Sequence, residues 1–137
     1  MLLVLTVAVL ALQIKPNERL CDEDGTTTAV NACLNQKLKR ANERLDRYLQ
    51  AATDRHPEDE KAAVRLGLQA SQRAFEAYRS IECDTVFEDW KEGTIRGSMG
   101  LGCQVQLTDQ RTHDIWRHWL QYMDNTPPIL PEPQLTK

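Results

Sequence analysis

Four cysteines are the residues with the most definite chemistry in this chain. They are Cys21, Cys33, Cys83 and Cys103, and no two of them form the Cys-x-x-Cys pairs that usually hold zinc. An even number of cysteines behind an apolar amino terminus is typical of an exported protein with disulfide bonds. We therefore predict two disulfides and expect neither a metal ion nor a cofactor.

The histidines and serines do not form a recognisable catalytic group. His113 and His118 are five residues apart, so they point to different sides of a helix. Neither Ser71 nor Ser98 stands in the Gly-x-Ser-x-Gly setting of an esterase nucleophile. The sequence therefore favours a binding protein over an enzyme.

Acidic side chains gather near the end of the second predicted helix, beside a glycine-rich segment. Carboxylates are unfavourable at the carboxyl end of a helix, so helix stability does not account for them. Such a surface can steer a basic protein partner, and a merely solvated acidic face is the alternative interpretation. The candidate contacts are Glu82, Asp84, Glu88, Asp89 and Glu92, together with Arg96 and Ser98 of the glycine-rich segment.

Length and charge limit the classes of protein to consider. The chain has 137 residues, which suits one domain, and 27% of them are charged. The net charge of −3 argues against nucleic acid as a partner, because nucleic-acid binding needs a concentrated basic face.

The first 14 residues form an uncharged apolar segment that resembles a signal peptide. The segment is shorter than the roughly 20 residues that span a membrane, so we expect no stable membrane insertion after cleavage. No lysine or arginine precedes it, and a buried amino-terminal helix is the alternative. Leu20 before Cys21 does not fit a lipid anchor, so we expect a periplasmic or secreted protein.

Apolar residues at steps of three and four predict two long helices. The first begins at threonines 26–28, which can cap it, and the second runs from the turn at His56-Pro57 to about Trp90. Gly67 inside the second helix costs about 1 kcal/mol against alanine, and a close helix crossing would explain it. The first stripe comprises Val30, Leu34, Leu38, Ala41, Leu45, Tyr48, Leu49 and Ala52.

A glycine-rich loop over residues 91–102 and a third helix from Leu101 to about Met123 complete the predicted fold. Residues 125–137 are rich in proline and are expected to form an extended or disordered tail. The prediction is an all-α domain over residues 15–124, a small antiparallel three-helix bundle followed by a disordered tail.

The helix positions favour the disulfides Cys21–Cys33 and Cys83–Cys103. The first would tie the amino-terminal arm to the first helix, and the second would join the facing ends of the second and third helices. Cys33–Cys83 is the alternative, because the start of the first helix lies beside the end of the second.

Gln72-Arg73-Ala74-Phe75, followed by Tyr78-Arg79 and Cys83, resembles the A-Q-R-x-W-x-x-[YF]-R-x-x-x-C signature of the LprI-type lysozyme inhibitor family, with Phe75 in the place of the tryptophan. The resemblance covers about residues 21–120. A later segment resembles the family's C-x-x-x-L-T-x-x-R-T motif. The matching residues, which we assign to structural roles, are Gln72, Arg73, Phe75, Tyr78, Arg79, Leu107, Thr108 and Arg111.

Structural roles are the simpler interpretation of the signature. Arg73 and Arg79 are each expected to bond a carbonyl or a carboxylate across the bundle, and Phe75 and Tyr78 are expected to lie in the core. The resemblance implies a protein that binds lysozyme, or a related peptidoglycan-cleaving enzyme, and occludes its cleft without chemistry of its own. The alternatives are a periplasmic immunity protein against a delivered toxin and a structural or stress-related envelope module.

Overall fold

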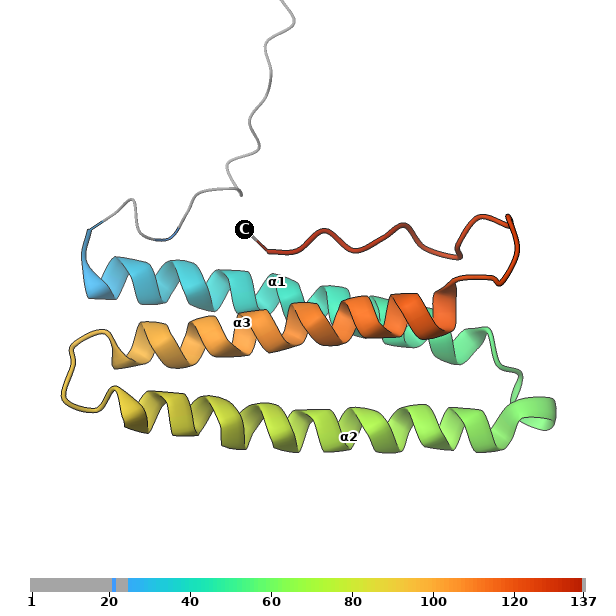
Figure 1. Ribbon diagram of the computed structural model, residues 1–137, viewed down its shortest axis with the longest axis horizontal. Coiled ribbons are helices and arrows are strands. Elements are labelled where there is room, and N and C mark those ends of the chain that lie inside the picture. Colours follow the sequence, from blue (N-terminus) through green and yellow to red (C-terminus); the bar gives the residue numbers. More distant parts are fainter. Residues whose placement is uncertain (1–20, 22–24, 137) are drawn as a thin grey trace, which may run out of the picture.

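The computed structural model describes residue 21 and residues 25–136 of the chain. Its helices are α1 (Thr27–Asp54), α2 (Glu58–Asp89) and α3 (Arg96–Ile115), and a short π-helical turn, η1 (Trp116–Leu120), continues α3 (Figure 1). The described residues contain no strand, so the predicted all-α fold is confirmed. The apolar segment 1–14, predicted to be a signal peptide, lies outside the described residues.

The three helices run antiparallel, and α3 lies between α1 and α2 (Figure 1). Because α1 and α2 contact each other only slightly, the bundle is an open layer of helices. α3 therefore packs on two sides, whereas α2 packs against α3 alone along most of its length.

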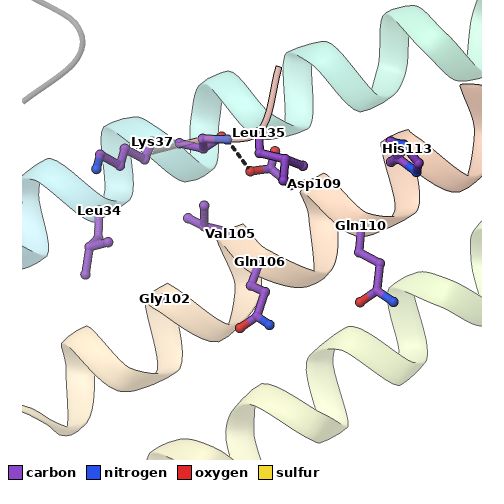
Figure 2. A pocket seen from close by; sticks show the side chains of 10 residues that line it. Leu34, Lys37, Gly102, Val105, Gln106, Asp109, Gln110, His113 and Leu135 are labelled. Atoms are coloured by element: carbon purple, nitrogen blue, oxygen red, sulfur yellow. Dashed lines mark hydrogen bonds between the residues drawn. The ribbon is translucent and has the colours of Figure 1, made fainter. Parts of the chain in front are cut away.

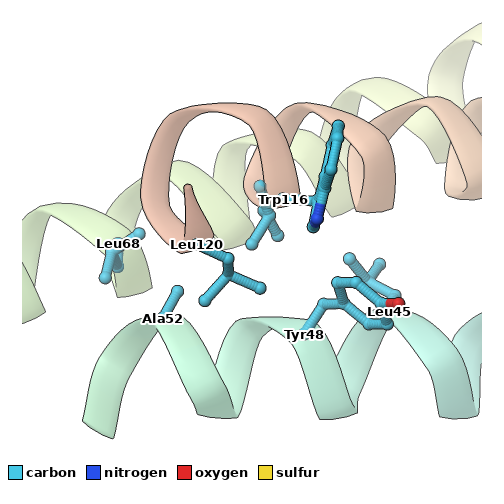
Figure 3. Packing of buried hydrophobic residues seen from close by; sticks show 7 residues of the cluster. Leu45, Tyr48, Ala52, Leu68, Trp116 and Leu120 are labelled. Carbon is cyan, nitrogen blue, oxygen red and sulfur yellow. The ribbon is translucent and has the colours of Figure 1, made fainter. Parts of the chain in front are cut away.

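The hydrophobic core lies where the carboxyl-terminal half of α1 meets the end of α3 and η1 (Figure 3). The predicted stripe of α1 is confirmed, because four of its members are buried: Ala41, Leu45, Tyr48 and Ala52. Burial of each large apolar side chain stabilises the fold by about 1.5–3 kcal/mol. The core residues are Leu45, Tyr48 and Ala52 of α1, Leu68 of α2, and Ile115, Trp116 and Leu120.

Local signals explain where the first two helices begin. The Thr26 hydroxyl accepts a hydrogen bond from the Ala29 amide at 3.2 Å, so the predicted threonine cap is confirmed. α2 begins directly after Pro57, and its first turn carries the carboxylates of Glu58, Asp59 and Glu60, which the helix dipole favours. It ends at Asp89, one residue before the predicted end.

The predicted loop over residues 91–102 is wrong in its second half. α3 begins at Arg96, so Gly97, Gly100 and Gly102 lie inside the helix. At the other end, α3 and η1 stop at Leu120, and Met123 of the predicted stripe is fully exposed. Glycine weakens a helix locally, and here the packing against two neighbouring helices outweighs that penalty.

Two of these glycines allow α3 to approach its neighbours closely. A Cβ atom at position 97 would lie 2.9 Å from the Asn31 side-chain nitrogen of α1. A Cβ atom at position 100 would lie 3.3 Å from the Phe87 Cβ of α2. Gly67 has no such role, since its Cβ position lies in open space, so the expected close crossing there is wrong.

The same substitution at two glycines therefore has opposite expected effects. Gly67→Ala should raise the free energy of unfolding by about 1 kcal/mol, because alanine favours the helix and meets no neighbour. Gly97→Ala should lower it, because Asn31 must move and give up the hydrogen bond that it accepts from Ser98. Urea unfolding of both variants tests this, and stabilisation by both would contradict the proposed role of Gly97.

Both favoured disulfides are present. Cys21 is bonded to Cys33 and Cys83 to Cys103, each with a Cα–Cα distance of 5.5 Å. The alternative pair Cys33–Cys83 is thereby excluded. The second disulfide joins α2 to α3 just below their connecting turn, so it holds the two helix ends in register.

The carboxyl-terminal segment is extended, which is one of the two alternatives predicted for the tail. Residues 129–136, here called the C-terminal strap, lie extended along the bundle (Figure 1). The Ile129 amide donates to the Leu120 carbonyl at 2.9 Å, which turns the chain back. Leu130 packs against the core and Pro133 is buried. The prolines prevent a helix, as predicted. The backbone of the strap forms hydrogen bonds with side chains of the bundle instead.

Side chains of α1, α3 and η1 hold the strap by its backbone. The Tyr48 hydroxyl donates to the Pro131 carbonyl at 2.7 Å, and the Trp116 indole donates to the Leu130 carbonyl at 3.0 Å. The Thr136 amide donates to the Asp109 carboxylate at 2.7 Å. Arg44 of α1 donates to the same carboxylate, also at 2.7 Å. The strap therefore completes the domain on the side of α1 and α3.

Candidate partner-binding face

The signature arginine Arg79 ties the three helices together. From α2 it donates to the Asn42 side-chain oxygen of α1 at 2.8 Å and to the Thr108 hydroxyl of α3 at 2.6 Å. Thr108 is completely buried. Hydrogen bonds to a charged donor contribute about 1.5–3 kcal/mol each. The Asn42 acceptor is the carbonyl oxygen of a side-chain amide, so the expected carbonyl partner of Arg79 is found, and the Thr108 hydroxyl is a second acceptor.

Arg111, the arginine of the later C-x-x-x-L-T-x-x-R-T motif, makes a similar bridge from α3 to α2. It donates to the Ser71 hydroxyl at 2.8 Å and to the Gln72 side-chain oxygen at 3.3 Å. Partial burial lowers the pKa of the Arg111 guanidinium, and the nearby Asp114 carboxylate opposes that shift. Arg111 and Arg79 both lie beside the Phe75 ring, at 5.8 and 5.4 Å from its centroid.

Three other signature residues lie closer to the surface. Phe75 is half-buried and packs on the edge of the core. Tyr78 is 52% exposed, so the prediction that it lies in the core is wrong. Arg73 is exposed as well. The cause is the open arrangement of the bundle, in which α2 has only one neighbouring helix to cover it.

The five predicted acidic contacts all lie exposed around the end of α2 and the turn that follows. Among the described residues, none of these carboxylates forms an ion pair with a lysine or an arginine. The Ser80 hydroxyl donates to one of them, Asp84, at 3.4 Å. We call this group the acidic end of α2; it comprises Glu82, Asp84, Glu88, Asp89 and Glu92.

The basic and polar candidates lie in the first turn of α3, at the same end of the molecule. Arg96 is exposed, and its guanidinium lies 4.8 Å from the centroid of the Phe87 ring. Ser98 is half-buried and donates to the Asn31 side-chain oxygen of α1 at 2.6 Å. Ser98 therefore has a partner inside the domain, whereas Arg96 faces solvent.

Sequence reasoning missed a cavity of about 580 Å³ between α1, α3 and the strap (Figure 2). Leu34, Val105 and Leu135 form its apolar walls, and Gly102 leaves it open on the α3 side. Asp109 stands at its edge, bonded to the strap. The signal for this cavity was absent from the sequence, because one wall comes from a tail that was expected to be extended or disordered.

The structure does not assemble a catalytic group from the histidines and serines considered above. His113 lies 3.1 Å from the Glu132 carboxylate of the strap, and His118 is exposed. The Ser71 hydroxyl donates to the Leu68 carbonyl and accepts from Arg111. In the part of the chain that the structure describes, no cluster of histidine, cysteine or acidic residues is arranged to hold a metal ion.

The fold and the surface together define a small helical domain, closed by two disulfides, whose charged end faces solvent. The chain belongs to the LprI lysozyme inhibitor family, whose family model matches residues 21–115. No curated protein and no solved structure matches the chain. The family match ends at the last residue of α3, so η1 and the strap lie beyond it.

Two features fit a location outside the cytoplasm: the disulfides and the membership in a lysozyme inhibitor family. Of the helices described, none has the length and apolar character that crossing a membrane requires.

Proposed function

We propose that the protein binds lysozyme, or a related peptidoglycan-cleaving enzyme, and occludes its substrate cleft with the acidic end of α2. The observation that carries the proposal is the exposure of five carboxylates around the end of α2, where the helix dipole disfavours the two in the last turn, Glu88 and Asp89. These carboxylates destabilise the end of the helix, and binding to a basic partner would account for their presence. The family match supports the class of partner.

Electrostatics gives the acidic end its part in binding. Lysozymes are commonly basic, so their surface potential is complementary to this end of the molecule. Complementary charge mainly raises the rate of association, by about tenfold or more at low salt. The exposed guanidinium of Arg96 lies at the same end of the molecule, over the Phe87 ring, and is suited to a catalytic carboxylate of the enzyme, because glycosidases cleave with a carboxylate pair.

Inhibition of this kind needs no chemistry from the inhibitor. The cleft is blocked for as long as the complex persists, so inhibition should be stoichiometric and reversible. Export belongs to the proposal too: residues 1–14 would direct the chain to the periplasm, where such an enzyme reaches the cell wall.

The direct test is lysozyme turnover of cell walls, measured with and without the oxidised, signal-free protein. We expect inhibition that weakens as salt rises from 0.01 M to 0.15 M (approximate values), because the Debye length falls from about 30 Å to about 8 Å. No inhibition of either animal or bacterial lysozymes would remove this function. Capture of a delivered toxin would then favour the immunity-protein alternative.

A matched pair of charge variants locates the contact on α2. Glu88→Gln/Asp89→Asn/Glu92→Gln should slow association by about tenfold at low salt. The control, Glu58→Gln/Asp59→Asn/Glu60→Gln, removes the same number of charges from the opposite end of α2 and should bind almost like the wild type. Equal slowing by both variants would mean that net charge matters and that the acidic end is not the contact.

A further inference from the structure

The outward face of α2 carries large apolar side chains that the fold does not use. Because α2 packs mainly against α3 and only slightly against α1, the side of α2 away from α3 faces solvent (Figure 1). Ile81 is 70% exposed, Leu66 is 64% exposed and Tyr78 is 52% exposed. Single exposed apolar residues are ordinary on protein surfaces. A group of them on one face is what indicates a binding surface.

Tyr78 and Ile81 form such a group, and it adjoins the acidic end. They are three residues apart and so lie on neighbouring positions of one helix face. Asp84 follows Ile81 by three residues and Glu82 follows Tyr78 by four, so each apolar side chain has a carboxylate beside it. Leu66 lies more than three turns away, toward the start of α2.

A shallow hollow lies next to Tyr78. Its volume is about 230 Å³, enough for one large side chain of a partner. It is formed between α2 and α3, and its lining includes Phe75, Tyr78, Leu107 and Arg111. The surface therefore offers an exposed apolar residue, Ile81, and a recess next to the neighbouring Tyr78.

We propose that Tyr78 and Ile81 are the apolar anchors that the target enzyme buries, with the acidic end of α2 as the charged rim. This inference rests on the proposed function and specifies its contact surface. The partner is a basic enzyme with an apolar patch beside its cleft, since only such a surface matches both the carboxylates and the anchors. Protein interfaces commonly have this anatomy, with an apolar centre inside a polar rim.

Anchors and rim have different kinetic signatures. The carboxylates act at a distance, so they set the association rate and its dependence on salt. Tyr78 and Ile81 act only after contact, so they set the dissociation rate. Loss of an anchor should therefore shorten the life of the complex and leave the salt dependence of association unchanged.

The test compares Ile81→Ala with Leu66→Ala, which removes an apolar side chain of similar exposure from the same helix. We expect Ile81→Ala to weaken inhibition of lysozyme by about tenfold through faster dissociation. Leu66→Ala should inhibit like the wild type. Tyr78→Ala should behave like Ile81→Ala, and Tyr78→Phe should retain most of the affinity. Thermal unfolding should be nearly the same for all of them, because the side chains are exposed.

The outcomes separate this inference from the function on which it rests. If the wild type inhibits and Ile81→Ala inhibits equally well, the assignment of Tyr78 and Ile81 as anchors is wrong, and the proposed inhibitory function is unaffected. Equal weakening by Leu66→Ala would also overturn the inference, because the contact would not be confined to Tyr78 and Ile81. A wild type that inhibits no lysozyme would remove the proposed function and this inference with it.

Discussion

Replacing Cys83 and Cys103 together with alanine should lower the free energy of unfolding by about 3 kcal/mol on the chain-entropy estimate. The bond closes a segment with a sequence separation of 20, and Cys83 is 1% exposed. Without it, the ends of α2 and α3 can separate around their connecting turn. Urea unfolding of the double variant measures the loss, and inhibition at a temperature where it remains folded measures the effect on binding.

The other disulfide is the matched control for that variant. Cys21→Ala/Cys33→Ala opens a segment with a separation of 12, so a similar loss of about 3 kcal/mol is expected. This bond ties the start of α1 and does not hold the end of α2. We therefore expect weaker inhibition from the folded Cys83→Ala/Cys103→Ala variant only, and loss of inhibition in both folded variants would contradict this expectation.

Asp109→Ala should be the most harmful single substitution, with a loss of about 3 kcal/mol in the free energy of unfolding. The Asp109 side chain is 7% exposed and accepts from both Arg44 and the Thr136 amide. Its removal leaves the Arg44 guanidinium without its carboxylate, and its Nε atom is already buried without a hydrogen-bond partner. Because Arg44 is 21% exposed, water compensates for part of this loss.

Asp114→Ala is the control on the same helix. Asp114 pairs with Arg117 at 3.5 Å, and both side chains are well exposed, so its removal should change stability by about 0.5 kcal/mol or less. Tryptophan fluorescence should also distinguish the variants, because the Trp116 indole donates to the strap. If Asp109→Ala left both stability and fluorescence unchanged, Asp109 would not be what holds the strap to the bundle.

Helix identity and disulfide pairing could be predicted because both depend on short-range patterns. The α1 stripe, the Thr26 cap and the turn at Pro57 are local features, and each is found as expected. The pairing of Cys83 with Cys103 followed from the placement of two helix ends beside one turn.

The start of α3 and the place of the strap could not be predicted in the same way. Gly97 and Gly100 disfavour a helix in isolation, and they are tolerated because they let α3 approach α1 and α2. The prolines of the strap prevent regular structure, and its backbone is held by side chains of the bundle, those of Tyr48, Trp116 and Asp109. Both features depend on residues far away in the chain.

The candidate site shows the same division. The order of residues alone places the carboxylates at the end of α2, since five acidic residues lie within eleven positions there. Exposure is a property of the assembled bundle. The spacing of the apolar residues on α2 predicts that they lie in the core. α3 covers only one side of that helix, so Tyr78 and Ile81 face solvent. Periodicity determines which residues share a face, and only the packing of the helices determines whether that face is covered.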